Sequence, residues 1–358
     1  MLGIIMAGGK GTRLFPLTEN KPKPLVEILG IPVIDYVKDA LIKASVEEIV
    51  VTTGFHGESL KKLVSSWDNN SDIECSVNQE AQPMGTAGSV KLLHERLTQT
   101  FIVASGDAVL SSELNLLIDA HKSSGAKVTM ALWEVEDPTE FGIVGLSKHH
   151  QGELNGNLNE GYIVKFLEKP TKEQAFSTVI NAGLYIIEPD VMDYVPHGEK
   201  YDFSKQLFPN LLESGIPLYA VKLNGAWFDV GTPEELIKAQ NYLLRNSDSL
   251  PFDLPKGTLS SDHGFLFESA ITQSSLVDSV VCNYSKVGSN SQIKESLVMK
   301  QSEIGNDCQI MNTIIGENVS VGNRCILINC VVGDGVEIPD NSKICDERIS
   351  LSTNNHTE

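Results

Sequence analysis

A repeat of 17 residues in the last third of the chain limits the possible folds more than any other feature. Aliphatic side chains recur at this spacing in three tracks between residues 276 and 344. The tracks are Val281, Val298, Ile315 and Val332; Val287, Ile304, Val321 and Ile338; and Leu276, Ile293, Ile310, Leu327 and Ile344. The tracks are 6, 6 and 5 residues apart, which gives one coil of chain three flat sides. Apolar residues at a fixed period are typical of a solenoid whose stacked coils share one core.

Small residues occupy one corner of this repeat, four positions after the second track. They are Ser291, Cys308, Cys325 and Ser342. An aliphatic residue followed by a small one at this distance is the hexapeptide signature of a parallel β-helix, which we expect to be left-handed. Cys308 and Cys325 are then expected to stack inside the coil, as packing residues at a tight corner without a chemical role.

The first 247 residues have a different pattern. Leu2–Met6, Glu48–Thr53 and Phe101–Ala104 are apolar runs of strand length, and the apolar residues after Pro32 have helical spacing. Strands that alternate with helices predict an α/β fold, with a Rossmann-like, mostly parallel sheet and helices on both faces. Ligands of such sheets bind beyond the carboxyl ends of the strands, which directs attention to the loops after the first and third of these runs.

The sequence therefore predicts two domains. The first spans residues 1–247, and residues 248–264, rich in Ser, Asp, Pro and Gly, form a linker. The β-helix spans residues 265–346, and the polar residues 347–358 are expected to be a disordered tail.

Composition argues against several function classes. The chain has 47 Asp and Glu residues against 28 Lys and Arg residues, a net charge of −19, and neither domain is basic, so no nucleic-acid partner is expected. No basic leader opens the chain, and no apolar run reaches the roughly 18 residues of a membrane span. The six cysteines show no CxxC pair and no metal-ligand spacing. We therefore expect a cytoplasmic protein without a membrane partner.

A glycine-rich loop follows the first predicted strand. Gly8, Gly9 and Gly11 lie within four positions, so that backbone N–H groups can approach an anion closely, and Thr12 and Arg13 come next. The guanidinium of Arg13 suits phosphate oxygens. The spacing matches neither a Walker A loop nor the dinucleotide-binding fingerprint. Taken alone, the loop fits an ordinary turn as well as a phosphate site.

Three more charged residues stand in unusual settings. Prolines flank Lys23 and stiffen its backbone, which suits a charge clamp, although a solvated surface lysine is the alternative. Asp107 follows a predicted strand at the carboxyl edge of the sheet, and Asp229 lies in an apolar run. Mg²⁺ held by one or two carboxylates and phosphates is a common arrangement, and a cap or an ion pair is the alternative for either residue alone.

The run from Gly8 to Leu41 resembles the signature of the sugar nucleotidylyltransferase family. Further matches follow in the order typical of the family: Glu80–Gly88, Gly106–Asp107, Glu140–Val144, Phe166–Pro170, Asn181–Tyr185 and Trp227–Pro233. A C-terminal hexapeptide β-helix also occurs in many members. The resemblance covers nearly the whole chain and implies that residues 1–247 form a catalytic domain.

This resemblance implies an enzyme that acts on a nucleoside triphosphate and a hexose 1-phosphate and needs Mg²⁺. An oxygen of the sugar phosphate attacks the α-phosphorus, and pyrophosphate leaves. By resemblance, Arg13 and Lys23 contact the triphosphate and the attacking phosphate. Lys169 contacts the sugar phosphate, and Asp107 and Asp229 hold the metal ion.

Binding residues follow from the same motifs. The residues expected to bind the nucleotide are Gly8, Gly9, Gly11, Thr12, Glu80, Gln82 and Gly85. Those expected to bind the sugar are Gly142, Glu168 and Asn181. A surface ion pair with Lys169 is the alternative for Glu168.

Two residues bear on the choice of base. A carboxylate such as that of Glu80 can accept hydrogen bonds from both adjacent donors of guanine, whereas the amide of Gln82 suits the N3–H of a pyrimidine. The motif Pro83–Gly88, together with Lys21–Pro24, looks most like the mannose-1-phosphate guanylyltransferases. GTP and mannose 1-phosphate are therefore the expected substrates, and a glucose-1-phosphate thymidylyltransferase or uridylyltransferase is the alternative.

Two other functions fit the sequence less well. A non-catalytic regulatory protein that binds sugar nucleotides would be expected to lose charged site residues, yet Arg13, Lys23, Asp107, Lys169 and Asp229 are all present. An acyltransferase in the β-helix would need more coils and a histidine beside them. We expect the β-helix to serve structure and assembly, and the protein to be a homo-oligomer.

Overall fold

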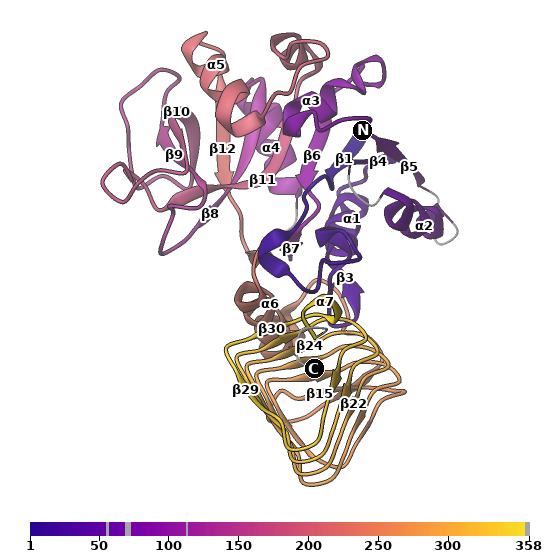
Figure 1. Cartoon of the computed structure of the whole chain (residues 1–358). Coiled ribbons are helices and arrows are strands. Elements are labelled where there is room, and N and C mark those ends of the chain that lie inside the picture. The colour runs from indigo at the N-terminus through magenta and orange to yellow at the C-terminus, as the bar shows by residue number, and fades with distance from the viewer. Residues whose placement is uncertain (55–56, 69–72, 112–113, 355–358) are drawn as a thin grey trace. The chain divides into compact units, whose positions relative to one another are not determined.

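The chain folds into two compact units, shown in the computed structural model of Figure 1. The structure describes residues 1–54, 57–68, 73–111 and 114–354. Met1–Gly9 and Ile34–Trp227 make up the first unit, and Lys10–Val33 and Phe228–Glu358 make up the second. Segment 10–33 therefore belongs to the same compact unit as the β-helix. The predicted domain boundaries at residues 247 and 264 stay predictions.

The first unit contains a nine-stranded sheet. Its strands are β1 (Leu2–Met6), β4 (Glu48–Thr53), β5 (Glu74–Gln79), β6 (Phe101–Ser105), β8 (Val128–Glu134), β9 (Gly142–Ser147), β10 (Glu160–Glu168), β11 (Val179–Ile187) and β12 (Leu218–Lys222). Their order across the sheet is β5-β4-β1-β6-β11-β8-β12-β10-β9. The pairings are such that only β10 and β11 run against the other strands. The α/β class and the mostly parallel sheet are thereby confirmed.

The other elements of this part of the chain are helices and two short strands, β7 and β13, which form a separate two-stranded sheet. They are α1 (Val33–Lys43), α2 (Gly57–Asp68), α3 (Gly85–Lys91), η3 (His94–Arg96), β7 (Ala108–Leu110), α4 (Asn115–Ser124), η4 (Pro189–Tyr194), η5 (Phe203–Leu207), α5 (Phe208–Glu213) and β13 (Trp227–Asp229). Ile4 of β1 packs in one core cluster with Val90 of α3, while the next residue, Ile5, faces the opposite side. Strands buried on both sides in this way explain the continuous apolar runs in the sequence.

The second unit is dominated by the β-helix, whose three flat sides are visible in Figure 1. One side consists of β14 (Gly257–Leu259), β15 (Phe265–Phe267), β18 (Val280–Val281), β21 (Leu297–Val298), β24 (Ile314–Ile315), β27 (Val331–Val332) and β30 (Arg348–Ile349). The second side consists of β16 (Ile271–Thr272), β19 (Lys286–Val287), β22 (Glu303–Ile304), β25 (Ser320–Val321) and β28 (Glu337–Ile338). The third consists of β17 (Ser275–Val277), β20 (Gln292–Lys294), β23 (Gln309–Met311), β26 (Ile326–Ile328) and β29 (Lys343–Cys345).

The register of these strands confirms the 17-residue repeat. Val298 pairs with Ile315, and Ile315 pairs with Val332, in parallel strands of successive coils. Parallel strands in three stacked sheets are consistent with the predicted left-handed β-helix. Cys308 and Cys325 are fully buried in the coils, as expected, and each thiol donates to a carbonyl of the next coil.

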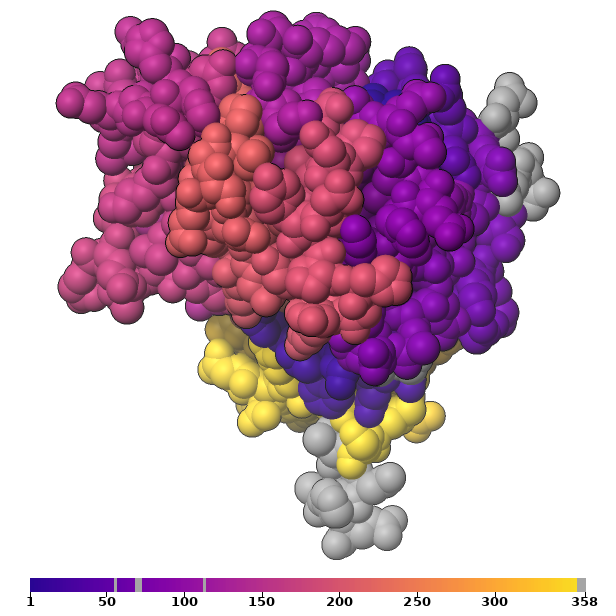
Figure 2. Space-filling view, turned by 90° about the horizontal axis from the view of Figure 1, so that it is seen from above, coloured from indigo at the N-terminus to yellow at the C-terminus, as the bar shows by residue number. Residues whose placement is uncertain are grey.

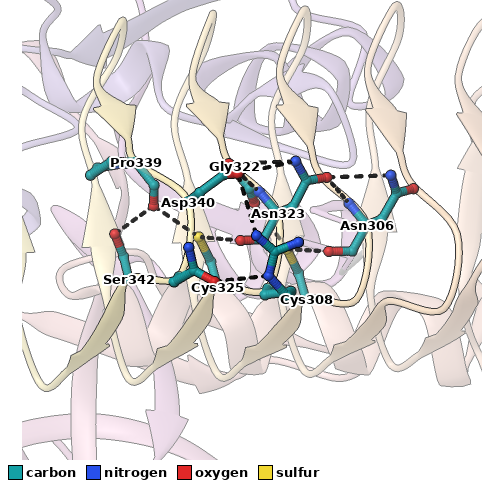
Figure 3. A network of polar contacts seen from close by, with 10 residues as sticks. Asn306, Cys308, Gly322, Asn323, Cys325, Pro339, Asp340 and Ser342 are labelled. Atoms are coloured by element: carbon teal, nitrogen blue, oxygen red, sulfur yellow. Dashed lines mark hydrogen bonds and ion pairs between the residues drawn. The ribbon is translucent and has the colours of Figure 1, made fainter.

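Figure 3 shows how one corner of the coil is held together by polar side chains. The carboxylate of Asp340 accepts the N–H of Asn323, and the Asn323 side chain accepts the N–H of Asn306 in the preceding coil. Each side chain thus satisfies a backbone donor one coil away, where the chain turns and the sheets leave that donor without a strand partner.

The ends of the β-helix extend beyond the predicted boundaries. The linker predicted at residues 248–264 includes β14, which pairs antiparallel with β15. Within the predicted tail, the structure has β30, which begins a sixth coil, and α7 (Leu351–Asn354) follows it. The reason is Ile349, which continues the first aliphatic track 17 residues after Val332 and is 9% exposed. The last residues of the predicted tail, 355–358, lie outside the described residues.

The second unit also contains segment 10–33 and one long helix. The elements are η1 (Thr12–Leu14), η2 (Lys23–Leu25), β2 (Glu27–Ile28), β3 (Ile31–Pro32), α6 (Pro233–Arg245) and η6 (Ser247–Ser249). Arg245 of α6 makes two hydrogen bonds to Asp278, and Gln240 of the same helix donates to the carbonyl of Ser296. The helix therefore lies against the corner where the third side of the β-helix meets the first. No helix in the described part of the chain is long and apolar enough to span a bilayer.

Candidate active site

The carboxyl edge of the sheet in the first unit carries the first predicted site residues. Met6 at the end of β1 pairs with Ser105 at the end of β6, so the loops that follow these strands lie side by side. Gly8 and Gly9 are exposed, and side chains added to them would meet no other atoms. Asp107 is half-buried, and its carboxylate accepts a hydrogen bond of 2.5 Å from the Ser105 hydroxyl. The first loop thus presents open backbone next to a fixed carboxylate.

The predicted base-binding loop is tied together by Glu80. One oxygen of its carboxylate accepts the N–H of Met84 at 3.0 Å, and the other accepts the hydroxyl of Ser89. The side chain of Gln82 is exposed, and its amide lies 3.9 Å from the Met84 sulfur. Glu80 therefore shapes the loop, and both of its oxygens already have a donor within the protein.

Gly85 stands where the backbone of a distant segment comes close. Its φ is +74°, and a Cβ built on it would lie 2.6 Å from the carbonyl oxygen of Tyr201. That carbonyl accepts the N–H groups of Ala87 and Gly88, and the Tyr201 N–H donates to Met84. Figure 2 shows these two segments next to each other on the surface of the first unit, around α3 in purple and around residue 201 in pinkish red.

The predicted sugar-binding residues come together at β9, β10 and β11. Gly142 pairs with Glu168 across two strands, so the Glu168 side chain passes over a position without a Cβ. Burial, and secondarily the Asp202 carboxylate, raise the pKa of Glu168 above its usual range, against the effect of Lys169. Asn181 lies at an irregularity of β11, where its amide donates to the Tyr185 hydroxyl at 2.8 Å.

Lys169 follows Glu168 in an uncommon backbone conformation. Its φ is +47°, in the left-handed region, although it is not a glycine. Its N–H donates to the Phe141 carbonyl, and its ammonium lies 3.2 Å from a carboxylate oxygen of Glu140. The side chain is 51% exposed, so it is accessible to a phosphate. A non-glycine residue in this region costs about 1–3 kcal/mol, and such residues cluster at binding and active sites.

In the second unit, three of the predicted catalytic residues lie together. The ammonium of Lys23 is 2.9 Å from a carboxylate oxygen of Asp229. Gly231 lacks a side chain where the Arg13 guanidinium passes, since a Cβ there would lie 2.9 Å from Arg13 Nη2 and 3.2 Å from Asp229 Oδ2. Lys23 is 8% exposed, which is rare for a lysine and depends on the paired carboxylate.

The turn that presents Arg13 is fixed locally. Gly11 precedes η1, and its carbonyl accepts the Thr18 hydroxyl at 2.8 Å and the N–H of Leu14. Thr12 and Arg13 are exposed on this turn. Prolines on both sides of Lys23 shape η2, as the sequence suggested.

The predicted metal ligands lie in different units, Asp107 in the first and Asp229 in the second. Within the described ranges, no group of three or more His, Cys, Asp or Glu side chains is arranged to hold a metal ion. A metal site made of two carboxylates therefore stays a prediction.

Sequence reasoning missed the segment around Tyr201. Thr86 donates to the Asp202 carboxylate at 2.9 Å and accepts the Phe203 N–H at 2.9 Å, and Ser204 accepts from Asn181 at 3.2 Å. This segment therefore connects the predicted base loop with the predicted sugar site. The one sequence signal was Asp202, a typical cap residue that accepts from the first N–H groups of η5.

Comparison with known proteins shows which family the chain belongs to. A family model described as "Nucleotidyl transferase" matches residues 2–246, which is more than half of the chain. The chain belongs to the nucleotidyl transferase family. A second model, described as "GlmU-like, C-terminal hexapeptide", matches residues 263–350 of this nucleotidyl transferase.

Curated relatives cover most of the same region. The chain is 33% identical over 247 residues to a UTP–glucose-1-phosphate uridylyltransferase of Synechocystis sp., over 64% of this chain and 60% of that protein. It is 32% identical over 250 residues to mannose-1-phosphate guanyltransferase beta-A of Xenopus laevis, over 69% of this chain and 65% of that protein. It is also 32% identical over 240 residues to the mannose-1-phosphate guanyltransferase of Saccharomyces cerevisiae, over 66% and 63%. The chain thus spans less than two thirds of the length of these relatives.

Proposed function

We propose that this nucleotidyl transferase is a sugar-1-phosphate nucleotidylyltransferase. It would transfer a nucleoside monophosphate from a nucleoside triphosphate to a hexose 1-phosphate and release pyrophosphate. The observation that carries the proposal is the cluster of Arg13, Lys23 and Asp229 in the second unit. A lysine paired with a carboxylate, with an arginine close to both, suits a triphosphate that must approach another anion.

The chemistry needs little beyond position and charge. An oxygen of the sugar phosphate forms a bond to the α-phosphorus, and the bond from that phosphorus to the bridging oxygen breaks. The electron pair leaves with pyrophosphate. Arg13 and Lys23 would neutralise charge on the phosphates, and Lys169 would hold the sugar phosphate in line. Such positioning and electrostatic stabilisation supply most of the rate in phosphoryl transfer.

The proposed reaction also needs a divalent cation, for which Mg²⁺ is the candidate. Asp107 and Asp229 offer hard carboxylate oxygens, which Mg²⁺ prefers, and two carboxylates with substrate phosphates are enough to hold it. Asp229 lies beside the ammonium of Lys23 and close to the guanidinium of Arg13, a setting that can also accommodate a further cation when phosphates are bound. When bound, the ion would offset negative charge on the reacting phosphates.

The sugar end is supported by the strands β9, β10 and β11. Glu168 offers a carboxylate acceptor beside the backbone of Gly142. Asn181 lies on β11, where its amide donates to the Tyr185 hydroxyl. Sugar hydroxyls are both donors and acceptors, so a carboxylate, an amide and close backbone groups suit them.

For the specific substrates we infer GTP and mannose 1-phosphate. Two of the relatives named above are mannose-1-phosphate guanyltransferases, and the motif at Pro83–Gly88 resembles the motif of such enzymes. Glu80 adds less support than its sequence suggested, because both oxygens of its carboxylate accept hydrogen bonds within the loop. A base that binds at Glu80 would have to share that carboxylate with the Met84 N–H or the Ser89 hydroxyl.

A pyrimidine nucleotide is the second candidate. The exposed amide of Gln82 suits the N3–H of uracil or thymine, and one relative is a UTP–glucose-1-phosphate uridylyltransferase.

Pyrophosphate release, measured with GTP, dTTP or UTP against mannose 1-phosphate and glucose 1-phosphate, tests both levels of the proposal. We expect activity that requires Mg²⁺ and is highest for GTP with mannose 1-phosphate. A preference for dTTP or UTP would overturn the guanine assignment alone. Tight binding of a sugar nucleotide without pyrophosphate release from any pair would instead support the non-catalytic regulatory function.

A further inference from the structure

Charged side chains at one corner of the β-helix repeat with the period of its coils. Lys300, Glu317 and Asp334 are 17 residues apart, and each follows the end of a strand by two positions. Because those strands, β21, β24 and β27, pair in register, the three side chains stand one above another on successive coils. We call these three residues the charged column.

The charged column is matched to two residues of segment 10–33. The ammonium of Lys21 lies 2.6 Å from Glu317 Oε1 and 3.3 Å from Asp334 Oδ2. The ammonium of Lys300 lies 2.9 Å from Glu27 Oε1 and 3.4 Å from Glu317 Oε2. The order of charges along the coils is therefore complementary to the order along the segment, a feature that specifies register more than it adds stability.

Three members of these ion pairs are largely shielded from solvent. The side chains of Lys21, Glu27 and Glu317 are 14%, 13% and 18% exposed. Burial disfavours the charge on Lys21, but Asp334 and Glu317 outweigh it and raise the pKa of Lys21. Burial disfavours the charge on Glu317 as well, yet Lys21 and Lys300 lower its pKa. Removal of one member would leave a partly buried charge without its partner, which is costly.

Arg348 makes a second connection, at the last coil. In the four preceding coils its position holds an aliphatic residue: Val280, Leu297, Ile314 and Val331. The guanidinium of Arg348 donates to the carbonyl oxygens of Arg13, at 2.7 Å, and of Phe15, at 3.3 Å. Arg348 thus replaces an aliphatic residue of this series and holds the main chain of the turn that presents Arg13.

Close packing completes this contact. A Cβ built on Gly333 would lie 3.1 Å from Pro16 Cβ, so the segment lies directly on the coil at this point. The Ser352 hydroxyl donates to the Glu19 carboxylate at 3.0 Å. Contacts between residues 13 and 27 of the segment therefore reach the last four coils of the β-helix, which begin at β21, β24, β27 and β30.

We propose that the charged column and Arg348 are positioning residues for nucleotidyl transfer. They hold segment 10–27 on the β-helix, so that Arg13 and Lys23 stay beside Asp229. The inference rests on the proposed function, which assigns the triphosphate to those two cations. A displacement of about 1 Å in such groups can lower the rate on the order of a hundredfold. The β-helix thus acts in the reaction without contact to a substrate.

The test compares two substitutions at the contact with matched substitutions elsewhere on the β-helix. Arg348→Ala is paired with Arg324→Ala, because the Arg324 side chain bonds to Asn341 and Asp340 at its own corner of the β-helix. Glu317→Gln is paired with Glu303→Gln, because Glu303 forms an exposed ion pair with Lys286 on another flat side. Steady-state kinetics would be measured well below the thermal midpoint of each variant.

We expect Arg348→Ala and Glu317→Gln to lower kcat on the order of tenfold and to raise KM for the nucleoside triphosphate. KM for the sugar phosphate should stay within about twofold, since Lys169 and Glu168 belong to the first unit. Arg348→Lys should restore part of kcat, because an ammonium can still donate to a carbonyl. The two control variants should match the wild type.

Hydrogen exchange gives a readout that does not depend on activity. The N–H groups of Leu14 and Leu17, which bond to carbonyls within the turn, should exchange faster in Arg348→Ala and at the wild-type rate in Arg324→Ala. Equal kinetics and equal exchange in these two variants would overturn the inference. A wild-type protein that releases no pyrophosphate would refute the proposed function, while the exchange comparison would still decide whether Arg348 holds the turn.

Discussion

Substitution of Gly85 by alanine tests how the base loop is built. Gly85 has a φ of +74°, and an added Cβ would lie 2.6 Å from the Tyr201 carbonyl oxygen. Gly125 provides the control: its φ is +65° at the C-terminus of α4, and an added Cβ would meet nothing within 4 Å. Both variants place alanine in the left-handed region, and only Gly85→Ala meets a neighbouring backbone.

The expected difference follows from these two environments. The left-handed conformation costs alanine roughly 1–2 kcal/mol at either position. At Gly85 the Tyr201 carbonyl must also move, and it accepts the N–H groups of Ala87 and Gly88. Each of these hydrogen bonds contributes about 1 kcal/mol. Gly85→Ala should therefore lower the free energy of unfolding by about 2 kcal/mol more than Gly125→Ala.

Urea unfolding followed by tryptophan fluorescence measures this difference in the relevant unit. The three tryptophans, Trp67, Trp133 and Trp227, all belong to the first unit, so their emission reports its unfolding. Under the proposed function, Gly85→Ala should also raise KM for the nucleoside triphosphate, whereas Gly125→Ala should not. Equal losses of stability in the two variants would show that contact with Tyr201 does not shape the loop.

Three further predictions concern charged groups. Lys169→Ala and Lys169→Gly should both raise KM for the sugar phosphate. The glycine variant should be the more stable of the two in thermal unfolding, because the φ of +47° suits glycine. Equal stability of the two variants would argue against backbone strain at this residue. Burial, assisted by Asp202, raises the pKa of Glu168, so its carboxylate should protonate before ordinary carboxylates do as the pH falls. KM for the sugar phosphate should then rise in the wild type. In Glu168→Gln it should be high at every pH, because the amide does not titrate. Although burial opposes it, Lys21 and Lys300 lower the pKa of Glu317, so its stabilising effect is present above the unfolded pKa of about 4.3 and is lost as the pH falls through the lower folded value. Urea unfolding followed by circular dichroism should therefore show that Glu317→Gln destabilises the protein at pH 7 and that the difference from the wild type shrinks at acid pH.

Much of the fold could be predicted because its signals are periodic. The aliphatic tracks predict the β-helix from sequence alone, since each inward position must be apolar in every coil. The buried strands of the first unit were found for a similar reason, as runs such as Phe101–Ala104 pack on both faces. The start of the sixth coil, β30, was not predicted because Arg348 interrupts one outward series and most residues after it are polar, while Ile349 alone continues a track.

The site was predicted less completely, because much of it is backbone. Residue types pointed to Arg13, Lys23 and Asp229, and the structure brings these three together. The support for the base loop comes instead from the main chain of Tyr201, which has no side-chain signature. Glu80 shows the opposite problem: its charge suggested base recognition, whereas its carboxylate bonds to Met84 and Ser89 in its own loop.

The charged column shows what a sequence period can and cannot reveal. The spacing of 17 places Lys300, Glu317 and Asp334 on one line as soon as the β-helix is recognised. It does not reveal that Lys21 and Glu27, which lie almost 300 residues earlier in the chain, complete that line. Polar residues on the outside of a solenoid normally face solvent, so their type alone gives no reason to look for partners. The reason appears only in the structure, where the column carries charges of both signs and Glu317 at its centre is 18% exposed. This combination separates a contact that specifies register from an ordinary solvated face.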